Sequence, residues 1–152
     1  MRLSEWFAGA PTREAAGPKV LAVAEAVLAT LGAVPDSDCW VIWGDDPGVR
    51  WALLAPTPAG LVTAHVRVNV PQEGPRAAGK LVRWSRIQLG EIAVEVQGAH
   101  RIISTTLEGM VLRGADADAD AVAAFLQVVV AAIDGRPLPV RVASPPAVTT
   151  EA

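Results

Sequence analysis

An almost uninterrupted apolar run fills residues 120–134, near the C-terminal end of the chain. Three aspartates precede or open this run and Gly135 follows it, which are typical boundaries of an α-helix. Gln127 is the only polar residue between Val122 and Ile133, so the helix is hydrophobic on nearly every side. Such a helix is expected to be buried on more than one face.

A sheet can cover one face of this helix, so a second cover is needed for the other face. Residues 18–32 predict another helix, with proline at its first position and glycine just past its end. Either this N-terminal helix or a second subunit is expected to cover Val128 and Val130, which we predict to be interface residues. The apolar run is shorter than the ~20 residues that cross a bilayer, so no membrane span is expected.

The region between the two predicted helices consists of short β-strand patterns separated by turns. Residues 61–70 alternate most regularly, which predicts one face in the core and the other facing solvent or a partner. The glycine- and proline-rich residues 71–79 are expected to form a surface loop outside any strand. The predicted strands are residues 39–44, 49–56, 61–70, 80–89, 91–97, 100–107 and 109–114.

Seven predicted strands followed by a helix resemble bacterial pleckstrin-homology-like domains. The resemblance is carried by residues 84–133, in which a strand ending in Ile87 leads to hairpins with a T-x-x-G turn, Thr106 to Gly109, and an acid-capped helix. It implies an α+β fold: a seven-stranded antiparallel sandwich or partly open barrel with a capping C-terminal helix, to which this chain adds an N-terminal helix. Lipid-binding relatives hold phosphoinositides with basic residues in the first hairpin loop. Here that loop, residues 45–48, is acidic, so phosphoinositide binding is not expected.

A second fold remains open, in which both helices cover one face of a single antiparallel sheet. Chaperone-like domains of secretion systems resemble this arrangement, but they usually carry a helix in mid-chain, where residues 71–79 leave no room for one. In either fold, residues 18–135 are predicted to be a single domain. Residues 1–17 are expected to be partly ordered, and the proline- and alanine-rich residues 136–152 to form a disordered tail.

Composition narrows the possible functions. The 152 residues carry a net charge of −3, which gives no reason to expect a nucleic-acid partner. A single cysteine permits no internal disulfide, and the N-terminus lacks the apolar core of a signal peptide, so the expected location is cytoplasmic. Half of the residues are hydrophobic, which predicts a well-packed domain.

The residues available for chemistry are few. The aspartate-rich segment before the last helix lacks a calcium loop's glycine and glutamate, because Ala121 and Gln127 occupy those positions. Cys39, His65 and His100 are too few for a structural zinc site, and no glycine-rich phosphate loop is present. We therefore expect no metal, no cofactor and no catalytic residues.

Two groups of residues are candidate binding surfaces. Trp43 and Trp51 flank the first predicted hairpin turn, where they could face each other and form an interface. The second group is basic, with one tryptophan among its members: Arg67, Arg76, Lys80, Arg83, Trp84 and Arg86. It has two interpretations: a site for an acidic peptide, nucleotide or lipid headgroup, or a solvated face on which arginine stems cover apolar surface.

The sequence as a whole favours a non-catalytic binding or assembly module that associates with itself or with another protein. The reason is the excess apolar surface of residues 120–134 together with the alternating strand of residues 61–70. A carrier of a small apolar ligand is the first alternative. An enzyme of unrecognised type is the second, since no acid–base or nucleophile set stands out.

Overall fold

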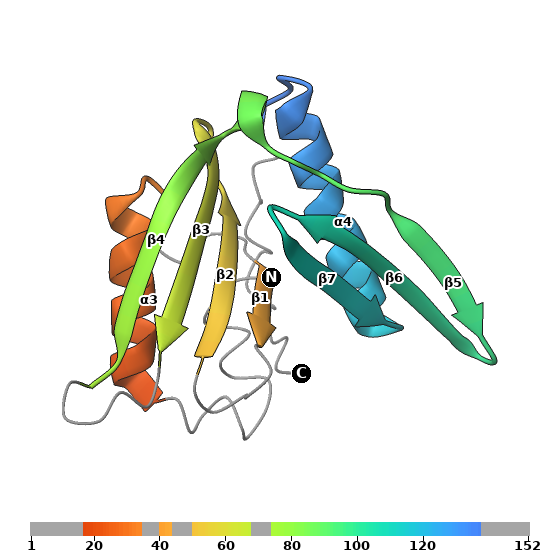
Figure 1. Ribbon diagram of the computed structural model, residues 1–152, viewed down its shortest axis with the longest axis horizontal. Coiled ribbons are helices and arrows are strands. Elements are labelled where there is room, and N and C mark those ends of the chain that lie inside the picture. Colours follow the sequence, from red (N-terminus) through yellow and green to blue (C-terminus); the bar gives the residue numbers. More distant parts are fainter. Residues whose placement is uncertain (1–16, 35–39, 44–49, 68–73, 138–152) are drawn as a thin grey trace, which may run out of the picture.

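The computed structural model describes residues 17–34, 40–43, 50–67 and 74–137, whose ribbon is coloured in Figure 1. The first half contains helix α3 (Gly17–Thr30) and strands β1 (Trp40–Trp43), β2 (Arg50–Pro56), β3 (Gly60–Arg67) and β4 (Arg76–Arg83). A short 3₁₀ helix, η1 (Trp84–Arg86), leads to strands β5 (Ala93–Gln97), β6 (His100–Leu107) and β7 (Met110–Ala115) and to helix α4 (Ala117–Ile133).

The strands form two antiparallel sheets with the orders β1-β2-β3-β4 and β5-β6-β7. Strands that follow one another along the chain are neighbours within each sheet, as in antiparallel hairpins. The predicted α+β class with antiparallel strands is therefore confirmed. Within the described residues, the two sheets stay open and form no closed barrel.

One face of the first sheet is covered by α3 (Figure 1). Val20, Ala24 and Leu28 follow one another at i+4 spacing and place a buried stripe of the helix against the strands. The strands meet this stripe with alternate residues, because every second side chain points to the same face. These strand residues are Trp51, Leu53 and Ala55 of β2 and Val62, Ala64 and Val66 of β3.

The opposite face of the first sheet supplies part of a second core. Leu54 and Leu61 pack there with residues of β6, β7 and α4, including Leu112. Helix α4 contributes Val122, Phe125, Leu126 and Val129 from its main apolar stripe, as the spacing predicts. The first sheet is thus a central layer with a helix on one face and the α4 assembly on the other.

The second face of α4 is not covered by α3, which was one of the two covers predicted for it. The buried stripe of α3 is already occupied by β2 and β3, on the far side of the first sheet. Along α4, Val128 is half-buried, while Val130 is 36% exposed and Ile133 is exposed. Part of the helix that was expected to lie between two layers therefore faces solvent.

The predicted loop of residues 71–79 and the strand after it need correction. Residues 71–73 lie outside the described part of the chain, but residues 76–79 belong to β4 and pair with β3. Glycine suits this pairing at Gly79, because an added Cβ would lie 2.8 Å from the carbonyl oxygen of Thr63. The strand ends at Arg83, and η1 replaces its predicted continuation.

The start of α4 also differs from the predicted cap. Asp116 occupies the N-cap position with φ of +53° but makes no side-chain hydrogen bond to the helix. Its carboxylate instead accepts a hydrogen bond from the backbone N–H of Arg101 and lies 2.7 Å from Nδ1 of His100. Asp118 and Asp120 do lie in the first turn, as predicted, and Asp120 pairs with Arg101.

Candidate functional site

Strand β5 is an edge strand of the second sheet, and it exposes a row of apolar side chains that begins one residue before the strand. The exposed fraction is 43% for Ile92, 62% for Val94 and 76% for Val96. Because these residues alternate along the chain, they lie on one face, next to the buried Ile103 of β6. The other edge of β5 has no strand neighbour among the described residues. We call Ile92, Val94 and Val96 the β5 valine row. Ile92 is an isoleucine and precedes the strand, but its side chain lies on the same face as the two valines.

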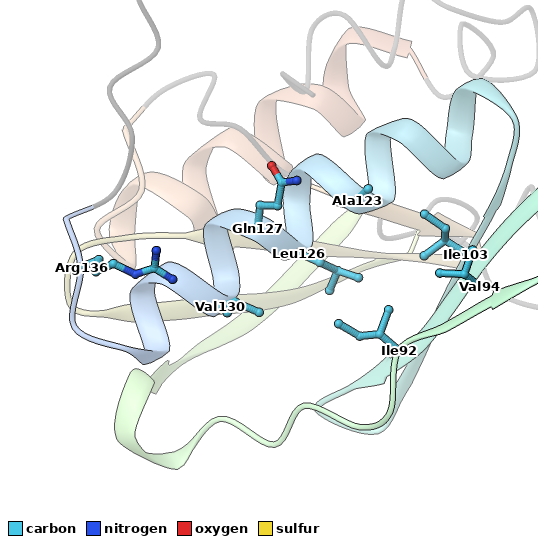
Figure 2. Close-up of a pocket in the computed structure, with 8 residues that line it drawn as sticks. All are labelled: Ile92, Val94, Ile103, Ala123, Leu126, Gln127, Val130 and Arg136. Atoms are coloured by element: carbon cyan, nitrogen blue, oxygen red, sulfur yellow. The ribbon is translucent and has the colours of Figure 1, made fainter.

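An open groove of about 560 Å³ runs between this row and α4. Figure 2 shows Leu126 and Val130 of α4 facing the same space as Ile92 and Val94, with Arg136 beyond the C-terminal end of the helix. The complete lining is Ile92, Val94, Ile103, Ala123, Leu126, Gln127, Val130 and Arg136.

The groove has the chemistry of a binding surface. Its only polar lining residues are Gln127 and Arg136, and the guanidinium of Arg136 lies 3.3 Å from a carboxylate oxygen of Asp134. The lining contains no carboxylate, histidine, cysteine or serine that could act as an acid, base or nucleophile. The groove therefore provides apolar area next to β5, whose outer edge is unpaired as far as the structure describes the chain.

The structure brings part of the predicted basic group together on the first sheet. Arg67 of β3 lies directly opposite Arg50 of β2 on one side and Arg76 of β4 on the other. Directly opposite residues point to the same face of a sheet, so the three guanidinium groups share one surface. Lys80 and His65 lie further along that face and are exposed, like the three arginines. We call Arg50, Arg67 and Arg76 the arginine row.

The remaining members of the basic group lie elsewhere. Arg83 points to the face of β4 that carries Ala77 and Leu81, which pack against the core under α3. Arg86 belongs to η1, so it does not share a strand with Arg83 as predicted. Trp84 packs against the second core, and its indole Nε1 donates a hydrogen bond to the carbonyl oxygen of Thr57 at 2.8 Å.

Of the predicted interface residues, the two tryptophans lie opposite each other as predicted, but one of them is buried. Trp43 and Trp51 are register partners across the first hairpin, but Trp51 is only 1% exposed because it packs beneath α3. Trp51 is therefore a core residue and presents no surface to a partner, while the side chain of Trp43 lies outside the described residues. Val128 is half-buried, and Val130 lines the groove.

Sequence reasoning did not single out Ile92, Val94 or Arg50 as site residues. The alternation of Ile92, Val94 and Val96 with smaller or polar neighbours was visible, but it is also typical of a strand with one face in a core. Arg50 was visible as a single charge. Its importance depends on strand register, which places it beside an arginine 17 residues away.

The described residues contain no cluster of three or more histidine, cysteine, aspartate or glutamate side chains that could hold a metal ion. His100 and Asp116 form a pair, and the hydrogen bond with His100, followed by that from the Arg101 N–H, lowers the pKa of Asp116. His65 lies on the other sheet. Cys39 lies outside the described residues.

Among the helices of the described residues, none has the length and apolar character needed to cross a membrane. Comparisons with family models, curated proteins and solved structures found no match to this chain.

Proposed function

We propose that this chain is a non-catalytic assembly module that pairs with a second copy of itself through the edge of β5. The observation that carries the proposal is the β5 valine row, which places three exposed apolar side chains along a strand whose outer edge has no partner strand among the described residues. Exposed apolar strands with an unpaired edge are templates for the addition of another strand.

The edge of β5 lacks the features that usually prevent such pairing. Natural edge strands are protected by lysine, proline, bulges or extreme shortness. Strand β5 has the sequence AVEVQ, with no lysine or proline, and pairs with β6 without a bulge. Its one charge, Glu95, points away from the valine row because the two alternate along the strand.

A two-fold arrangement of two β5 strands is compatible with the charges. If the axis passes beside Val94, Val94 of each copy faces Val94 of the other, and Glu95 faces Ala93. An axis at Glu95 would instead place two carboxylates directly opposite each other, which is destabilising. The favoured register continues the sheet from one copy into the next and joins the two valine rows beside both α4 helices, as a self-complementary interface requires.

Size-exclusion chromatography with light scattering tests the assembly. The wild-type chain should be a dimer in the micromolar range, and Val94→Lys should weaken dimerisation at least about 10-fold, because it places a charge in the middle of an apolar contact. Val111→Lys is the matched control, since Val111 is equally exposed on β7, an edge strand of the same sheet. A wild-type chain that stays monomeric at high micromolar concentration, or equal effects of the two variants, would contradict the proposal.

The scaffold that we propose is pleckstrin-homology-like. The support is the order of elements: a sheet of strands β1 to β4, a sheet of strands β5 to β7, and a final helix that packs on β6 and β7. Helix α3 would be an addition to that scaffold. A crystal structure in which these strands and α4 do not superpose on such domains would remove this part of the proposal.

A carrier of a small apolar ligand is the second candidate, and the volume of the groove favours it. About 560 Å³ lies within the range of small-molecule sites, and Arg136 at one end could meet a carboxylate headgroup. Native mass spectrometry of freshly purified protein separates the two candidates. A bound apolar acid on a monomer would favour the carrier, and a ligand-free dimer would favour the assembly module.

A further inference from the structure

We infer that the arginine row, Arg50, Arg67 and Arg76, is a binding site for a chain of phosphate groups, such as a triphosphate. This inference does not depend on self-association, because the row lies on the first sheet and the proposed contact on the second. The folded chain alone leaves one feature of the first sheet unexplained, namely three like charges side by side.

Strand pairing forces these charges together. Arg50 begins β2, Arg67 ends β3 and Arg76 begins β4, so all three lie at the same end of the first sheet, the lower end in Figure 1. Two consecutive like-charge pairs directly opposite each other destabilise a sheet. A surface that serves only for solubility would gain from mixed charges at these positions instead.

No carboxylate of the described residues forms an ion pair with any member of the row. The ion pairs among the described residues involve His100, Arg101 and Arg136, all of which lie outside the first sheet. The three arginines are exposed, so their guanidinium groups are available to a ligand. Among the described residues, positive charge is therefore concentrated here, although the net charge of the chain is −3.

The spacing and chemistry fit a short polyanion. Neighbouring strands lie about 4.8 Å apart, so the backbone positions of the outer two arginines are separated by about 10 Å, with Arg67 between them. Arginine side chains are long enough to converge on a smaller ligand, and a guanidinium can bind a phosphate with two parallel hydrogen bonds. Lys80 and His65 on the same face add donors beside the row.

A phosphate chain suits this surface better than an extended acidic peptide. A peptide strand presents side chains to one face every second residue, about 6.7 Å apart, which is wider than the spacing of the arginines. A single small anion such as sulfate offers only about four oxygen atoms to three guanidinium groups, each of which can donate two parallel hydrogen bonds. Several adjoining phosphates can engage all three guanidinium groups at once.

Isothermal titration calorimetry with the full chain tests the site, with tripolyphosphate as the probe and no added divalent cation. Tripolyphosphate should bind at least about 10-fold more tightly than sulfate, and an increase of ionic strength from about 0.05 to 0.15 M should weaken binding. Arg67→Gln, which removes the central guanidinium, should weaken tripolyphosphate binding at least about 10-fold. Arg67→Lys should weaken it less, because charge is kept while the fork of donors is lost.

The matched control is Arg83→Gln, which makes the same change of charge on the opposite face of the first sheet. This variant should bind tripolyphosphate within about 2-fold of wild type once general charge effects are screened. Equal losses for Arg67→Gln and Arg83→Gln, or no binding by the wild-type chain, would overturn the inference. Misfolding of Arg67→Gln is not expected, since the change removes two unfavourable charge pairs, and its thermal midpoint should equal or exceed that of wild type.

A nucleoside triphosphate, used as a second probe, distinguishes the two sources of a phosphate chain. Binding that is as tight as or tighter than that of tripolyphosphate, and lost in Arg67→Gln, supports a nucleotide as the ligand. Binding of tripolyphosphate alone supports a free phosphate chain. Binding of phosphoinositide-containing vesicles without binding of either soluble probe would overturn the inference.

Discussion

Strands β3 and β5 are both rich in valine, yet one is almost wholly buried and the other almost wholly exposed. In β3, the residues from Gly60 to Ala64 and Val66 are buried, whereas in β5 only Ala93 is even partly covered. The difference lies in the layers around them. Strand β3 is an inner strand with α3 on one face and part of the second core on the other. Within the part of the chain that the structure describes, β5 has one strand neighbour and an open groove.

The comparison shows that apolar character alone does not distinguish a core strand from a binding strand. A valine gains stability only when other atoms replace the water around it. The layers of the first sheet provide those atoms for β3 within one chain. For β5 the described residues do not provide them, and we expect a second chain to do so.

The largest loss of stability is expected for a substitution on the face of β3 that packs in the second core. Leu61 is fully buried, and it packs with Leu54, Leu107 and the apolar stripe of α4. Leu61→Ala should lower the free energy of unfolding by about 3 kcal/mol, through lost burial and the cavity that remains. Denaturant unfolding followed by circular dichroism measures this loss. Leu89→Ala, at a half-buried position of the same cluster, is the control and should cost clearly less.

The close packing of α4 on β7 of the second sheet depends on Gly114. A Cβ at Gly114 of β7 would lie 2.5 Å from the carbonyl oxygen of Asp118, in the first turn of α4. Gly114→Ala should therefore push the helix away from β7 and cost about 2 kcal/mol, because backbone cannot move aside as a flexible side chain can. Gly90→Ala is the control, since its Cβ would meet the Thr106 oxygen at 3.3 Å, and it should cost less than about 1 kcal/mol. Equal losses would mean that α4 is not held by this contact.

A matched pair of valines tests the comparison of the two strands directly. Val66 of β3 is fully buried under α3, whereas Val96 of β5 is 76% exposed. Val66→Ala should lower the free energy of unfolding by roughly 2 kcal/mol, and Val96→Ala by less than about 0.5 kcal/mol in the monomer. Repeating the measurement at several protein concentrations sharpens the test. If β5 pairs between copies, the loss of unfolding free energy caused by Val96→Ala should be larger at high concentration than at low concentration.

Much of the fold could be predicted because local patterns decide it. Apolar stripes predicted both helices, and turn residues with alternation predicted the antiparallel strands. The position of α3 could not be predicted in this way. Its stripe of Val20, Ala24 and Leu28 fits any apolar surface, and only the packed structure shows that this surface is the sheet and not α4.

The candidate sites were harder to predict, because they depend on register and layer order. The basic group was recognised, but Arg50 joins Arg67 only through pairing across β2 and β3. Arg83 leaves the group because it points to the other face of β4. The predicted interface at Trp51 failed for a related reason: a tryptophan on a short strand suits a core as well as a surface, and α3 decided between them.

The smallest change in stability is expected at the contact between the second sheet and the start of α4. There the carboxylate of Asp116 is hydrogen-bonded to His100 and to the backbone N–H of Arg101. These hydrogen bonds lower the pKa of Asp116 in the folded chain below its unfolded value of about 3.9. The ionised carboxylate therefore stabilises the fold above pH ~4, and this contribution is lost as the pH falls through the folded pKa. Asp116→Asn should lower the thermal midpoint at pH 6, and the difference from wild type should shrink towards pH 2.

The choice of asparagine isolates the charge of Asp116 from its backbone. Asp116 has a positive φ, which asparagine tolerates as well as aspartate, so the substitution adds no strain. Asp118→Asn, in the first turn but without the contacts to β6, is the control for a general change of charge at the start of α4. In a His100→Asn background, the Asp116→Asn substitution should lose most of its pH-dependent effect, because the hydrogen bond with His100 is the largest cause of the lowered pKa. A difference that persists unchanged at pH 2, or that survives His100→Asn, would show that Asp116 holds the second sheet to its helix by shape and not by charge.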